Sequence, residues 1–67
     1  MDTAKLRGII SERGFSQRQV AKAMGMSEKT FYFKMKKGSF GTDEAEQMID
    51  LLKIDDPVSV FFTRKVT

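Results

Sequence analysis

The chain has 67 residues, which is enough for one small domain, residues 1–67, and too few for a large buried core. It contains neither cysteine nor histidine, which excludes disulfide bridges, thiol nucleophiles, zinc fingers and imidazole acid–base catalysis. The net charge is +3, but residues 1–37 hold nine basic and three acidic side chains, whereas residues 38–67 hold three basic and six acidic ones. A basic half favours a polyanionic partner, and a lopsided solvated surface is the alternative.

Further absences narrow the class of protein. No apolar run approaches the roughly 18 residues of a membrane span, and no signal-peptide core follows Met1. No P-loop, Gly-x-Gly-x-x-Gly or metal-ligand spacing is present. We therefore expect a cytoplasmic binding protein rather than an enzyme or a membrane protein, with no cofactor and no metal; the lack of cysteine fits a reducing compartment.

The first predicted helix covers about residues 3–13. Its apolar residues recur at the i, i+3, i+4 spacing of one helix face, namely Leu6, Ile9 and Ile10. Asp2 or Thr3 can cap its start, and Gly14 stands where a helix often ends.

Two short helices follow with the same pattern of caps. Ser16 and Gln19 form a capping-box pattern for a helix that ends at Gly25. Ser27 can cap a helix that runs from residue 28 and stops at Gly38. The sequence therefore predicts two helices joined by a connection of only about three residues.

The fourth predicted helix is capped by Thr42 and has acidic residues in its first turn, where the helix dipole favours negative charge. Its apolar face contains Ala45, Met48, Ile49 and Leu52. We expect Asp56-Pro57 to open a short fifth helix that is followed by an extended tail within residues 57–67. The alternative is a terminal strand that pairs with another protomer, because residues 58–63 are rich in strand formers.

The second and third helices predict a helix-turn-helix at about residues 17–37. The glycine of Gly25-Met26-Ser27 allows a sharp reversal, and Ala21 can lie where the two helices approach closely. The stretch Gln17–Phe31 resembles the phage-repressor and Cro type of helix-turn-helix, the lambda-repressor-like DNA-binding family. The Thr30-Phe31-Tyr32 run with Lys34-Met35 is similar to small phage and prophage regulators of Gram-positive bacteria.

The resemblance covers about residues 3–54 and implies an all-α domain of four to five helices whose third helix enters the DNA major groove. If Phe31 and Met35 face the core, the 100° turn per residue directs Lys29, Phe33, Lys36 and Lys37 outward. Lys34 departs from the family, which often has an aliphatic core residue there. We therefore expect the third helix to be slightly rotated or lengthened.

The candidate base-contacting residues are Glu28, Lys29, Thr30 and Phe33. Lysine can donate to guanine, threonine can contact a base edge or a thymine methyl, and glutamate can accept from cytosine N4. Phe33 can pack on thymine methyl groups, or it can be an edge-of-core residue. The alternative for Glu28 is complementation of the helix dipole, and the lysines can be a solvated face.

The candidate phosphate-contacting residues are Gln17, Arg18, Tyr32, Lys36, Lys37 and Ser39. The resemblance implies that Gln17 binds backbone phosphate and braces the recognition helix. An ordinary polar first-turn residue is the alternative at that position.

These expectations combine into one functional hypothesis. The protein is a sequence-specific double-stranded DNA-binding transcriptional regulator, a phage or prophage repressor that occludes its operator in the bacterial cytoplasm. A homodimer on an inverted repeat fits, with residues 58–66 as a possible interface. The alternative is a protein-interaction module of the same fold, an antitoxin or anti-repressor partner, that uses Tyr32 and Phe33 as an apolar anchor.

Overall fold

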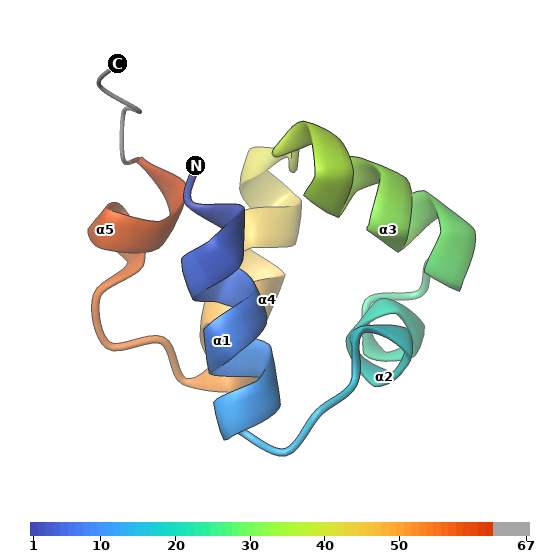
Figure 1. The fold of residues 1–67 in the computed structure, drawn as a ribbon, viewed down its shortest axis with the longest axis horizontal. Coiled ribbons are helices and arrows are strands. Elements are labelled where there is room, and N and C mark those ends of the chain that lie inside the picture. The colour runs from blue at the N-terminus through green and yellow to red at the C-terminus, as the bar shows by residue number, and fades with distance from the viewer. Residues whose placement is uncertain (63–67) are drawn as a thin grey trace.

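The computed structural model describes residues 1–62 and has five α-helices within them, with no strand in that range. They are α1 (Thr3–Glu12), α2 (Gln17–Ala23), α3 (Glu28–Lys37), α4 (Thr42–Leu52) and α5 (Pro57–Phe61). In Figure 1, α1 and α4 lie between α5 on one side and the α2–α3 pair on the other. The all-α expectation is confirmed, and the number of helices is the upper of the two expected.

Side chains cap the first three helices as the sequence indicates. Asp2, not Thr3, caps α1, because its carboxylate accepts from the backbone N–H of Lys5 at 3.0 Å. The capping box of α2 is complete: Ser16 Oγ accepts from Gln19 N at 3.1 Å, and Gln19 Oε1 accepts from Ser16 N at 2.8 Å. Ser27 Oγ accepts from the N–H of residue 30 at 3.1 Å and starts α3.

The start of α4 differs from the expectation. Thr42 is the first helical residue and not the cap; Gly41 is the N-cap. The backbone N–H of Gly41 donates to Glu44 Oε1 at 2.8 Å. The carboxylate three residues into the helix therefore satisfies the exposed amide, and no capping hydroxyl is needed.

The fifth helix forms as expected, and the strand alternative is wrong for residues 57–61. Asp56 accepts from Ser59 N at 3.3 Å and Pro57 is the first helical residue. The N–H of Asp2 donates to the carbonyl of Val60 at 2.8 Å, which ties α5 to the start of α1. The proposed extended tail, and the part of the 58–66 segment beyond residue 62, lie outside the described residues.

One core collects side chains from all five helices. The buried apolar residues are Leu6, Ile10, Val20, Ala21, Phe31, Met35, Met48, Leu52, Ile54 and Val60. The ring of Phe31 lies 5.4 Å from the ring of the half-buried Phe40. This aromatic contact packs the α3–α4 connection against the core. Val60 is 0% exposed, so it completes the core of a single chain and is not available to a second protomer.

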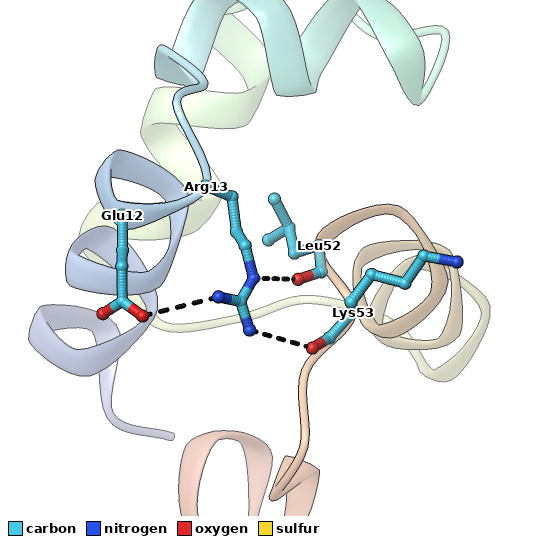
Figure 2. A network of polar contacts seen from close by, with 4 residues as sticks. All are labelled: Glu12, Arg13, Leu52 and Lys53. Carbon is cyan, nitrogen blue, oxygen red and sulfur yellow. Dashed lines mark hydrogen bonds and ion pairs between the residues drawn. The ribbon is translucent and has the colours of Figure 1, made fainter.

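Arg13, just after α1, binds the end of α4 (Figure 2). Its Nε donates to the carbonyl of Leu52 at 2.8 Å, and Nη2 donates to the carbonyl of Lys53 at 3.1 Å. The backbone of Lys53 adopts the left-handed conformation, with φ 53°, and α4 ends there. The carbonyls of Leu52 and Lys53 therefore lack a helical N–H donor, and Arg13 supplies the donors. Arg13 therefore holds the ends of α1 and α4 together. This cation of residues 1–37 thus has a structural role.

Candidate nucleic-acid interface

The segment from α2 to α3 has helix-turn-helix geometry. Gly25 adopts φ 74°, a conformation that side chains with a Cβ rarely adopt, and the chain reverses there. The N–H of Met26 donates back to the carbonyl of Ala21 at 3.0 Å. Ala21 itself is 1% exposed. Residues 17–37 thus form two helices fixed to each other through a small buried side chain.

The two faces of α3 divide as helical geometry predicts. Phe31 and Met35 are buried in the core. The other face is solvent-exposed and contains Glu28, Lys29, Thr30, Tyr32, Phe33, Lys36 and Lys37. Helix α3 lies with α2 at one end of the long axis of the molecule (Figure 1).

Two aromatic side chains project from this basic face. Tyr32 is 63% exposed and Phe33 is 57% exposed, so the edge-of-core alternative for Phe33 is wrong. The ammonium of Lys37 lies 5.0 Å from the centroid of the Phe33 ring, within cation–π range. The ring therefore stands on the surface of α3 beside a positive charge.

Lys34 has a role that the sequence did not indicate. Its ammonium binds the carboxylate of Glu44, and the two side chains are 32% and 21% exposed. The hydrogen bond from Lys34, followed by the backbone N–H of Gly41, lowers the pKa of Glu44. Helix α3 runs from Glu28 to Lys37 and is capped by Gly38, as the sequence predicts, and Phe31 and Met35 keep their inward face.

Ser27, the N-cap of α3, forms a hydrogen bond with Thr30, one of the candidate base-contacting residues. The hydroxyl of Ser27 donates to Thr30 Oγ1 at 2.9 Å. This bond fixes the threonine side chain at the N-terminal end of α3 while the residue stays exposed. Glu28 and Lys29 are exposed beside it, so the three residues form one polar cluster at the start of the helix.

The candidate phosphate contacts do not form a single group. Gln17, Tyr32 and Lys36 line one cavity of about 230 Å³, together with Thr3, Arg7 and Met35. Arg18, Lys37 and Ser39 are exposed but do not line it. No pattern in the sequence indicated Thr3 and Arg7 as site residues, because they precede the helix-turn-helix and reach it only through the packing of α1.

The charge asymmetry of the sequence is present on the surface. Between Gln17 and Lys37 the only acidic residue is Glu28. On α4 the residues Asp43, Glu46 and Asp50 are exposed. The α2–α3 segment is therefore basic, and the exposed face of α4 is acidic.

Neither a metal site nor a membrane span is found in the part of the chain that the structure describes. Within residues 1–62, no cluster of three or more acidic side chains has a geometry that could hold a metal ion. No helix in that range is long and apolar enough to cross a membrane.

The fold and this surface define an all-helical domain with a helix-turn-helix and a basic, aromatic-bearing outer helix. The chain belongs to the DUF739 family, described as a protein of unknown function, whose match spans residues 1–64. Comparison with curated proteins and with solved structures finds no match.

Proposed function

We propose that this protein is a lambda-repressor-like regulator that binds duplex DNA in a sequence-specific manner. The observation that carries the proposal is the exposed face of α3, where hydrogen-bonding and apolar side chains project from a helix fixed by Phe31 and Met35. An α-helix fits the major groove of B-DNA, which is about 12 Å wide. The resemblance of residues 17–31 to phage repressors and Cro supports the same docking.

The N-terminal end of α3 supplies the base contacts in this proposal. Lys29 donates to guanine O6 or N7, Glu28 accepts from cytosine N4, and Thr30 contacts a base edge or a thymine methyl. Phe33 is one turn further along, and its exposed ring packs on thymine methyl groups.

The remaining cations hold the protein on the DNA backbone. Lys36, Lys37 and Arg18 are exposed and positively charged, so each can bind a phosphate without reading sequence. Ser39 in the α3–α4 connection is exposed, and Gln17 and Tyr32 border the cavity beside α3. Their contacts fix the register of α3 in the groove.

A homodimer on an inverted repeat is the second part of the proposal. Helix α5 lies across α1 from α3 in Figure 1; its Val58 is 63% exposed, and Phe62, directly after the helix, is 71% exposed. Phe62 also lines a largely apolar cavity of about 340 Å³, together with Met1, Phe40, Ile49 and Phe61 among others. A second copy can bury this patch by a two-fold contact while both α3 helices reach half-sites about 34 Å apart.

Repression follows from occupancy and requires no catalysis or cofactor. A dimer on an operator excludes polymerase or a competing regulator from the same DNA. The protein then acts in the bacterial cytoplasm, at the nucleoid when it is bound, as a phage or prophage repressor.

The exposed aromatics of α3 also favour a second candidate, a protein-interaction module. Tyr32 and Phe33 form an apolar pair of the kind that anchors protein interfaces. An antitoxin or anti-repressor partner would use them to bind another protein rather than thymine.

Selection of duplexes from a random DNA library at several salt concentrations tests the proposal. An enriched inverted repeat supports the dimeric regulator, and a single enriched half-site supports DNA reading by a monomer. Weak binding that enriches no sequence and disappears at modest salt reflects only phosphate attraction, and it would overturn the repressor assignment.

A further inference from the structure

Two hydroxyl groups at the start of α3 are joined by a hydrogen bond. Ser27 Oγ accepts from the backbone N–H of Thr30 at 3.1 Å, and the hydroxyl of Ser27 donates to Thr30 Oγ1 at 2.9 Å. Both residues are exposed, so the core encloses neither hydroxyl. The bond therefore connects the cap of the helix to a side chain that is a candidate for base contact.

The hydrogens of this pair run in one direction. A hydroxyl has one hydrogen to donate and two lone pairs that accept. Because Ser27 donates to Thr30 Oγ1, the hydrogen of the threonine hydroxyl does not point back to Ser27. Helical threonines often donate to a carbonyl three or four residues earlier, but here the carbonyl of Ser27 accepts from the N–H of Phe31 at 3.0 Å. Within residues 1–62 the hydroxyl hydrogen of Thr30 has no protein acceptor.

This hydrogen needs an acceptor on DNA when α3 fills the major groove. Docking displaces the water that satisfies the hydroxyl in the free protein, and a buried donor without an acceptor is costly. The groove presents acceptors at purine N7, guanine O6 and thymine O4, and it presents amino donors at cytosine N4 and adenine N6. A base atom that accepts therefore binds this hydroxyl better than an amino group does.

We propose that Ser27 is a positioning residue that makes Thr30 a hydrogen-bond donor, so that Thr30 selects a base with a major-groove acceptor. The inference rests on the proposed function and narrows the threonine contact to one class of base atom. Ser27 acts through Thr30 and does not itself touch the base. The chain of bonds from Ser27 to Thr30 to the base is cooperative, because a hydroxyl that accepts a hydrogen bond becomes a stronger donor.

The test uses variants of the full chain that keep the helix cap and change the direction of the hydrogens. Ser27→Asp caps a helix as well as serine does, but a carboxylate has no hydrogen to give, so the hydroxyl of Thr30 donates to it instead of to DNA. Ser16→Asp is the matched control, because Ser16 is also exposed and caps α2 by accepting from the N–H three residues later. Thr30→Val removes the hydroxyl at nearly constant shape.

Binding is measured to the duplex that the library selects and to analogues of it that each lack one major-groove group. One set lacks a single acceptor, namely purine N7, guanine O6 or thymine O4, and the other set lacks a single amino group of cytosine or adenine. The affinity for each analogue is divided by the affinity for the intact duplex. A uniform loss caused by the added negative charge cancels in this ratio.

We expect one acceptor deletion to weaken binding of the wild type roughly three- to tenfold, the size of one hydrogen bond. The same deletion should change binding of Ser27→Asp and of Thr30→Val by less than about twofold, because each variant has already lost the contact. Ser16→Asp should keep the sensitivity of the wild type, and so should Ser27→Thr, which retains the capping hydroxyl. Thermal unfolding of Ser27→Asp should be close to that of the wild type.

Three results overturn the inference. If every acceptor deletion affects Thr30→Val and the wild type alike, Thr30 donates to no base. If Thr30→Val instead loses its sensitivity to deletion of an amino group, the hydrogen bond runs from the threonine to Ser27. If Ser27→Asp remains as sensitive as Ser16→Asp, the cap does not direct the threonine. Failure of the wild-type protein to select any duplex is a different result, because it removes the proposed function itself.

Discussion

The ammonium of Lys34 lies 2.5 Å from Glu44 Oε2 and joins the last turn of α3 to the first turn of α4. The other carboxylate oxygen of Glu44 accepts from the N–H of Gly41. One glutamate therefore caps the start of α4 and also forms the ion pair with Lys34 of α3. An ion pair therefore connects the two helices beside the buried side chains of Phe31 and Met35.

This pair makes stability depend on pH. The pKa of Glu44 is lowered in the folded state, chiefly by the Lys34 hydrogen bond, so its contribution is present above the unfolded value, about 4.3, and is lost as pH falls through the lowered pKa. We expect urea unfolding between pH 7 and pH 3 to show a fall in stability in acid that is reduced in Glu44→Gln. The control is Glu46→Gln, an exposed glutamate on α4. Equal acid sensitivity of all three proteins would contradict the role of the pair.

The bond from Arg13 to the end of α4 also predicts a stability loss. Arg13→Ala removes two donors from the carbonyls of Leu52 and Lys53 and should cost about 1–2 kcal/mol. Glu12→Ala removes only the exposed 3.4 Å ion pair to the same arginine and should cost below about 0.5 kcal/mol. Chemical denaturation of both variants measures the difference. Equal losses would mean that Arg13 acts through its surface ion pair.

The contact between α2 and α3 is tested at Ala21, which is 1% exposed. Ala21→Leu should force the two helices apart and destabilise the protein by about 1–3 kcal/mol. Ala23→Leu adds the same side chain two residues later at an exposed position, and its melting temperature should change little. An unchanged melting temperature for Ala21→Leu would show that the helix-turn-helix packing is incorrect.

Base reading by α3 is tested at Lys29. If it donates to guanine, Lys29→Ala should weaken binding by about 1–3 kcal/mol and relax the preference at one base pair. Lys36→Ala should instead weaken binding to all sequences about equally, because phosphate contacts do not read sequence. Repeating the library selection with each variant measures both effects. A protein partner lost in Lys29→Ala, with DNA binding intact, would favour the interaction module.

The exposed ring of Phe33 is tested with modified DNA. Replacing thymine by deoxyuridine removes only the 5-methyl group. One such replacement in the selected site should weaken the wild type, and Phe33→Ala should lose that sensitivity. If the variant binds every duplex as the wild type does, Phe33 does not contact DNA, and the apolar anchor of the alternative function gains support.

The sequence alone determined the elements of this domain and the two faces of its outer helix. Ser16, Ser27 and Gly38 act on the backbone within about four residues, so their effect can be inferred from spacing. The apolar repeat likewise places Phe31 and Met35 inward and Lys29 and Phe33 outward. Local hydrogen bonding and helical periodicity specify these features, so they can be inferred without knowledge of the long-range contacts.

Only the tertiary structure decided which residues distant in sequence meet. Arg13 reaches carbonyls 39 and 40 residues away, Lys34 pairs with Glu44 across a helix connection, and Arg7 shares a cavity with Gln17 and Lys36. Nothing in the spacing of these residues indicates the contacts, because a polar side chain on an exposed helix face has no preferred long-range partner. Packing of the buried apolar faces sets the relative positions of the helices. These positions then determine which polar side chains come close enough to form hydrogen bonds or ion pairs.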